Sequence, residues 1–172
     1  MGGRGAISGS LSKVERTILG IEKLRGNYNK EVLMVLSKDG KIEDEIIGKE
    51  MEVSYAFPKP LTDKIVSHNH PNIDGYNYAY YSKNDIDILF RTHANETRIS
   101  TNKETLSLKR NGKIDYNISK KYGNELNKTF RIADNKGLKG NEFYDYVSKE
   151  MQKWLRRNAK SYGFKFTIYK YK

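Results

Sequence analysis

The sequence of 172 residues contains no cysteine. This absence excludes a disulfide framework, a thiolate metal site and a thiol nucleophile, and it fits a reducing compartment. Long apolar runs are also missing, since no stretch approaches the roughly 20 residues of a bilayer-spanning helix, and the N-terminus has no signal-peptide core. These absences predict a cytoplasmic protein.

The length suits one domain, or one domain with a small appendage, and is sufficient to bury a core. Hydrophobic residues make up 37% and charged residues 31% of the chain, which is a polar but foldable composition. We find no internal repeat. Residues 1–10 are rich in glycine and predict a flexible leader; similar leaders occur in small proteins of phages and mobile elements, and we expect such an origin here.

The positive charge lies entirely in the second half of the chain. Residues 1–86 hold 12 basic and 12 acidic residues, whereas residues 87–172 hold 20 basic and 9 acidic residues and so account for the net charge of +11. A basic half beside a neutral half predicts an acidic partner, either nucleic acid or an acidic protein surface. A solvated, lysine-rich surface is the alternative.

The residue pattern predicts an α+β fold, with a mixed β-sheet flanked by helices. Ser12 and Glu15 form a capping box that begins a helix, and Gly26 ends it. Asn111-Gly112 predicts a hairpin turn. The expected helices cover residues 12–26, 82–92, 120–133 and 142–160, and the expected strands cover 31–37, 42–47, 52–57, 64–68, 97–101, 105–110 and 164–171.

Two histidines and a carboxylate have the spacing of a metal site. In Ser67-His68-Asn69-His70-Pro71 the histidines stand two apart on a strand, so their side chains point the same way, about 7 Å apart along the chain. Asp85, in the first turn of the next helix, can supply an oxygen ligand. Three protein ligands and one open position are typical of catalytic zinc.

This motif, His-x-His-Pro followed by Ser-x-x-Asp, resembles the JAMM signature of the JAB/MPN metallohydrolases, including their RadC-like branch. The resemblance covers residues 12–115 and implies a JAB/MPN-like core over residues 11–116, with a basic helical region over 117–172 that ends in a strand. It implies a zinc-dependent hydrolase of peptide or isopeptide bonds. Zinc would bind His68, His70 and Asp85, Ser82 would stabilise the oxyanion, and a glutamate near the first strand would act as general base.

Glu31 is the residue that best fits the position of the base, and Glu43 and Glu45 are alternatives. The sequence departs from the family in one spacing: eleven residues separate His70 from Ser82, where family members usually have seven. The added loop is rich in tyrosine and can form a lid or a binding surface, or prevent the site from closing around metal. Each residue also has an ordinary interpretation: Ser82 and Asp85 form a helix capping box, the histidines are polar residues at a strand end, and His93 is a surface residue at a helix end.

The C-terminal part mixes cations with aromatic residues, a pattern suited to single-stranded nucleic acid and also to protein interfaces. Trp154 and Leu155 fall on the apolar stripe of a helix and are expected in the core. Arg156, Arg157 and Lys160 remain as candidate contacts to phosphate or to an acidic partner. The alternative function is therefore an inactive JAB-like protein that binds nucleic acid or a nucleoprotein or defence complex, for example as an inhibitor.

Overall fold

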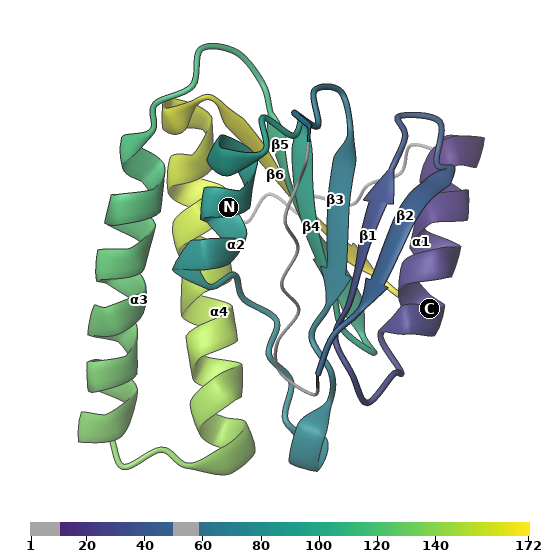
Figure 1. Ribbon diagram of the computed structural model, residues 1–172. Coiled ribbons are helices and arrows are strands. Elements are labelled where there is room, and N and C mark those ends of the chain that lie inside the picture. Colours follow the sequence, from purple (N-terminus) through teal and green to yellow (C-terminus); the bar gives the residue numbers. More distant parts are fainter. Residues whose placement is uncertain (1–10, 50–58) are drawn as a thin grey trace.

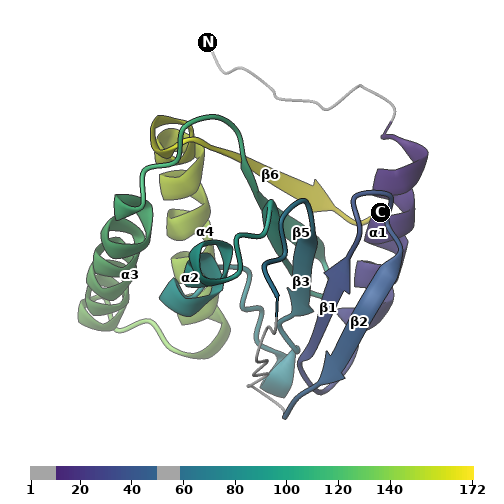
Figure 2. The same ribbon diagram turned by 45° about the horizontal axis from the view of Figure 1, so that its top comes forward.

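The computed structural model describes residues 11–49 and 59–172. One sheet separates helix α1 on one face from helices α2, α3 and α4 on the other (Figures 1 and 2). The predicted α+β class, a mixed sheet flanked by helices, is confirmed. The elements are α1 (Lys13–Arg25), β1 (Val32–Leu36), β2 (Ile42–Ile47), β3 (Ile65–Asn69), η1 (Ile73–Gly75), α2 (Lys83–Arg91), β4 (Glu96–Ser100), β5 (Glu104–Arg110), α3 (Asn117–Asn135), α4 (Gly140–Asn158), η2 (Ala159–Tyr162) and β6 (Phe164–Lys170).

The six strands are arranged in the order β2-β1-β3-β4-β5-β6. Neighbouring strands are antiparallel except for β3 and β4, which are parallel. A parallel pair requires a crossover connection, and here it consists of the loop after β3 together with α2. His70 and Asp85 lie in this crossover, and His68 lies in the strand that leads into it. As a result, the first turn of α2 lies at the carboxyl end of β3.

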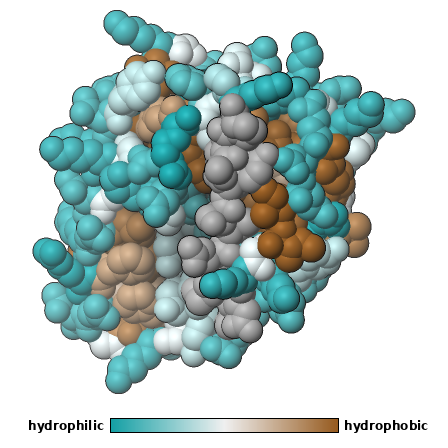
Figure 3. Space-filling view, viewed as in Figure 1, coloured by the Kyte–Doolittle hydropathy of each residue, from teal (hydrophilic) through white to brown (hydrophobic). Residues whose placement is uncertain are grey.

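Strand alternation divides the buried side chains between the two faces of the sheet. In β1, Leu33 and Val35 belong to the large core beneath α2, α3 and α4, whereas Met34 and Leu36 join a smaller cluster with Ile18 of α1. All five residues of β1 are buried, as expected for a strand covered on both faces. Edge strand β2 is different, since Ile42 and Ile47 are 41% and 66% exposed. Figure 3 shows apolar surface on the side where Figure 1 draws β1 and β2.

The face covered by α1 holds a buried ion network. Glu22 is fully buried and accepts hydrogen bonds from Arg98, from Nε at 2.9 Å and from Nη2 at 3.0 Å. Burial raises the pKa of Glu22, although Arg98 opposes this rise. Burial disfavours the charge of Arg98, but the surrounding carboxylates raise its pKa well above the ordinary value. The other members are Ser67 and Thr105, which donate to Glu22, and Glu96 and Glu15, which accept from Arg98.

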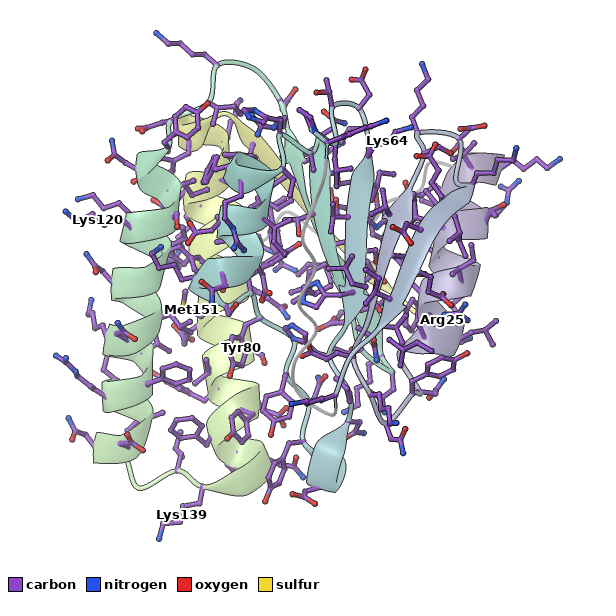
Figure 4. The ribbon with its side chains drawn as sticks, viewed as in Figure 1. Arg25, Lys64, Tyr80, Lys120, Lys139 and Met151 are labelled. Atoms are coloured by element: carbon purple, nitrogen blue, oxygen red, sulfur yellow. The ribbon has the colours of Figure 1, made fainter. Side chains whose placement is uncertain are left out.

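The second half of the chain completes the same sheet and the same core. Strand β6 pairs with β5 over seven residues. Helix α4 contributes Val147, Met151 and Leu155 to the large core, and Trp154 packs against it. In Figure 4, Met151 points inward while Lys139 points away from the helices. The division of the chain at residue 116 and the JAB/MPN-like identity of the core stay predictions.

The hairpin turn predicted at Asn111-Gly112 is wrong. Strands β4 and β5 instead turn at Thr101–Glu104, where Thr101 Oγ1 accepts from the N–H groups of Lys103 and Glu104. The Asn-Gly pair leads from β5 towards α3, because the next strand to pair with β5 is β6. Gly26 packs against the actual turn: a Cβ there would lie 2.1 Å from the carbonyl oxygen of Thr101.

The other helices and strands predicted within the described residues are all present, and their bounds agree with the predicted ones within a few residues. The strand expected over residues 52–57 and the leader over residues 1–10 lie outside the described residues. Within residues 11–49 and 59–172, no helix is both long enough and apolar enough to cross a membrane.

Candidate metal centre

Strand β3 positions the two histidines. His68 lies in the buried strand and points to the face covered by α2, whereas Ser67 and Asn69 point to the α1 face. His70 follows the strand, and its N–H donates to the Ser100 carbonyl at 2.7 Å, which extends the pairing with β4. The two imidazoles therefore lie on one face, with their Nε2 atoms 3.0 Å apart. The prediction that they point the same way is confirmed.

The first turn of α2 brings Asp85 to the histidines. Its Oδ1 lies 3.2 Å from His68 Nε2, and its Oδ2 lies 3.6 Å from His70 Nε2. The capping box of Ser82 and Asp85 is also present: the Ser82 N–H donates to Asp85 Oδ2 at 2.6 Å, and the Asp85 N–H donates to Ser82 Oγ at 3.1 Å. The cap thus holds one carboxylate oxygen and directs the other to His68.

One nitrogen or oxygen atom from each of His68, His70 and Asp85 lies within 4.8 Å of the others, so these three residues can hold one metal ion. Their side chains are only 4%, 13% and 13% exposed. Two imidazole nitrogens and a carboxylate oxygen form a donor set that suits zinc, with the fourth position left for water or substrate. The donor set fits a zinc ion.

The charges of the site are strongly coupled. Burial would raise the pKa of Asp85, but the two imidazoles outweigh burial and hold that pKa well below its usual value. Burial lowers the pKa of His70, but Asp85, the Tyr78 carbonyl and the charge of Glu31 together raise it above the ordinary value. The site therefore keeps Asp85 as a negatively charged carboxylate.

A backbone carbonyl fixes the orientation of His70. Its Nδ1 lies 2.7 Å from the Tyr78 carbonyl oxygen, which can only accept, so Nδ1 carries the proton and Nε2 of the neutral ring keeps its lone pair. Such a partner on the far nitrogen is typical of metal-binding histidines. His68 Nδ1 is buried and has no hydrogen-bond partner in the described part of the chain. The site thus fixes one of the two tautomers.

The tyrosine-rich loop between the ligands is bound to the helices through its carbonyl groups. Gln152 of α4 donates to the Ala79 carbonyl at 2.9 Å, and Tyr122 of α3 donates to the Tyr81 carbonyl at 2.8 Å. The aromatic rings of the loop pack on α4, where the ring centroids of Tyr78 and Tyr144 lie 4.5 Å apart. Gln152 and Tyr122 could not be predicted as supports of the site, because a contact to a backbone carbonyl leaves no signal in the sequence.

Glu31 lies directly before β1, on the face that also carries His68. Its backbone pairs with Gly48 and Lys49 at the end of β2, and its charge is one cause of the raised pKa of His70. The alternative bases are engaged elsewhere: Glu43 pairs with Lys64, and Glu45 pairs with Arg25 of α1. Among the three glutamates, Glu31 is the one that acts electrostatically on His70; its role as base stays a prediction.

Of the other residues singled out in the sequence, Ser82 lies at the site, whereas His93 and the three C-terminal cations lie outside it. The Ser82 hydroxyl accepts from Asp85 and keeps its own proton for donation. His93 is exposed after the end of α2, as expected. Arg156, Arg157 and Lys160 lie elsewhere, in the last turn of α4 and in η2. No protein-family model, curated protein or solved structure matches the chain, so any functional conclusion depends on the geometry of the site.

Proposed function

We propose that this protein is a zinc-dependent hydrolase that cleaves peptide or isopeptide amide bonds. The observation that carries the proposal is the convergence of His68, His70 and Asp85, whose ligating atoms lie within 4.8 Å of one another. Support also comes from the order of the motif, since His-x-His-Pro followed by Ser-x-x-Asp resembles the JAMM signature. A zinc ion in the site would polarise a substrate carbonyl and lower the pKa of a coordinated water.

The residues around the site have separate roles in this proposal. His70 is held by the Tyr78 carbonyl, so its Nε2 lone pair is already oriented. Asp85 is held by the Ser82 N–H, and the Ser82 hydroxyl proton is available to the developing oxyanion. Glu31, which acts electrostatically on His70, takes a proton from the attacking water and passes it to the leaving nitrogen. Water thereby adds across the C–N bond and yields a carboxylic acid and an amine.

The first experiment measures metal content by mass spectrometry on protein purified without a histidine tag. We expect about one zinc per chain in the wild type and none in the His68→Gln/His70→Gln variant. His93→Gln is the matched control, because His93 is the third histidine of the chain and is exposed. A protein that retains no zinc after loading and removal of excess metal would contradict the proposal.

The second experiment separates metal binding from catalysis. The wild type and Glu31→Gln are loaded with zinc and assayed on a panel of peptide and isopeptide amides. We expect Glu31→Gln to bind zinc as the wild type does and to lose at least a hundredfold in rate, the usual contribution of a general base. Equal rates for the two proteins would exclude Glu31 as the base. Zinc binding without hydrolysis of any amide would reject the hydrolase proposal but leave the metal site in place.

A further inference from the structure

A basic hollow lies at the end of α4, in a part of the molecule that the proposed hydrolase does not use. It has a volume of about 220 Å³ and is formed where α4, η2 and β6 meet. Three cations line it, namely Arg156, Lys160 and Lys165. Because ligand pockets usually enclose about 300–1,000 Å³, this hollow suits a phosphate group or one base better than a whole small molecule. The other lining residues are Asn111, Leu155, Ala159, Phe164 and Phe166.

A second hollow lies next to the first and is lined by residues close to the first lining in the sequence. Its volume is about 490 Å³, and it is lined by Lys113, Asp115 and Tyr116, together with Ile114, Asn117 and Ser161. The two linings are adjacent in the chain: Lys160 of the first hollow directly precedes Ser161 of the second, and Asn111 of the first lies two residues before Lys113 of the second. The two hollows therefore lie next to each other, and their cations together with the tyrosine are called here the basic surface: Lys113, Tyr116, Arg156, Lys160 and Lys165.

The basic surface presents an aromatic ring to solvent. Tyr116 is 63% exposed, and one side of its ring packs on Phe90 with centroids 4.9 Å apart. The contact with Phe90 supports the ring in place while most of the residue stays accessible. An exposed aromatic ring beside cations is the arrangement on which bases of single-stranded nucleic acid stack.

The cations of the basic surface have no ion-pair partner in the part of the chain that the structure describes. Within residues 11–49 and 59–172, no ion pair involves Lys113, Arg156, Lys160 or Lys165. Asp115 also lines the second hollow, but its carboxylate accepts from the backbone and side chain of Asn117. Three exposed lysines elsewhere do have acidic partners, in the pairs Lys83–Asp87, Lys128–Glu125 and Lys153–Glu150.

We infer that the basic surface binds single-stranded nucleic acid, with Arg156, Lys160 and Lys165 on phosphates and Tyr116 under a base. The four cations, which form no ion pair among the described residues, supply the phosphate contacts, and the exposed ring accounts for a base contact that an acidic protein would not require. This binding is independent of zinc, because none of the metal-centre residues lines either hollow.

The test measures binding of the full chain to a fluorescent oligothymidylate of about 15 nucleotides by anisotropy, from 50 to 200 mM salt. In Arg156→Gln/Lys160→Gln/Lys165→Gln we expect at least a tenfold loss of affinity and a salt slope that is shallower by about 2, since each phosphate contact to a single strand contributes about 0.7. The matched control is Arg131→Gln/Lys139→Gln/Lys149→Gln, which removes the same three charges from exposed positions on α3, at the start of α4 and on α4. Figure 4 shows Lys139 pointing into solvent at the far end of the helix pair.

Two further measurements separate nucleic acid from an acidic protein. Tyr116→Ala is expected to lose about tenfold in affinity for the oligonucleotide, while Tyr116→Phe, which keeps the ring, retains it. Equal effects of the two triple variants would overturn the assignment of the site. Polyglutamate that competes as well as the oligonucleotide, with no effect of Tyr116→Ala, would overturn the assignment to nucleic acid in favour of an acidic protein partner.

Discussion

The two faces of the sheet each bury a charged cluster, and both clusters use β3. Ser67 points to the α1 face and donates to Glu22, whereas its neighbour His68 points to the α2 face and meets His70 and Asp85. The clusters thus begin one residue apart in the sequence and differ in how completely the protein satisfies them.

On the α1 face, donors and acceptors match. The Glu22 carboxylate accepts from Arg98, Ser67 and Thr105, and the guanidinium of Arg98 also reaches Glu96 and Glu15. On the α2 face, Nε2 of a neutral His70 and Oδ1 of Asp85 are both acceptors, and both face a single group, Nε2 of His68, at 3.0 and 3.2 Å. A buried cluster with matched partners serves the fold, whereas one in which two acceptors face a single possible donor can also hold a cation.

The largest expected effect comes from breaking the matched cluster. Arg98→Met leaves buried carboxylates without their counter-charge, so we expect the free energy of unfolding to fall by about 3–5 kcal/mol. The measurement is urea unfolding of metal-free protein. The comparison variant, His68→Gln/His70→Gln, should lose less than about 2 kcal/mol, because Asp85 keeps its hydrogen bond from the Ser82 N–H and the new side-chain amides can donate to its carboxylate. Equal losses would remove the distinction between the clusters.

The next largest effect is stabilisation of the fold by metal bound to the cluster on the α2 face. At a free zinc concentration a hundred times the dissociation constant, binding adds about 2.7 kcal/mol to the stability of the folded state. For a chain of this size we expect the melting temperature to rise by about 5–10 °C, measured by calorimetry. His93→Gln should show the same rise and His68→Gln/His70→Gln none. A rise that persists in the double variant would place the metal elsewhere.

The metal affinity should also depend on pH. Asp85 and Glu31 raise the pKa of His70 against the effect of burial, and a metal binds only the deprotonated ring nitrogen. As the pH falls through this raised pKa, protons compete with zinc, and the affinity should fall towards tenfold per pH unit. Competition with a chromophoric chelator from pH 8 to pH 6 measures this fall. In Glu31→Gln the zinc affinity should begin to fall at a lower pH than in the wild type, because one charge that raises the pKa of His70 is removed. A zinc affinity that does not change with pH would contradict the assignment of His70 as a ligand.

The smallest effect concerns the loop that connects the ligands. Gln152→Ala removes the donor to the Ala79 carbonyl, next to the Tyr78 carbonyl that orients His70. Direct partners of metal ligands affect metal affinity by 10–100-fold, so we expect a smaller loss, below about tenfold, for this more distant contact. Lys149→Ala, at an exposed position of the same helix, is the control. Identical zinc affinities in the two variants would show that α4 does not support the site.

The metal centre was predictable because its determinants are local. Strand alternation places His68 and His70 on one face, and a capping box places Asp85 at the start of a helix. The network around Arg98 was not predictable, because a glutamate on an amphipathic helix is usually at the surface, and its partner lies 76 residues away. The hairpin prediction failed for a related reason: Asn-Gly indicates a turn but does not say which strand pairs next.

The hydrogen bond between Gln152 and the Ala79 carbonyl joins groups 73 residues apart in the sequence. During synthesis, His68, His70 and Asp85 therefore leave the ribosome well before the helix that holds their connecting loop. A nascent chain that has reached only α2 has all three ligands but no α4, and so lacks this support for the loop. Metal acquisition by the finished site is consequently expected to follow translation of α4 rather than to accompany synthesis of the ligands.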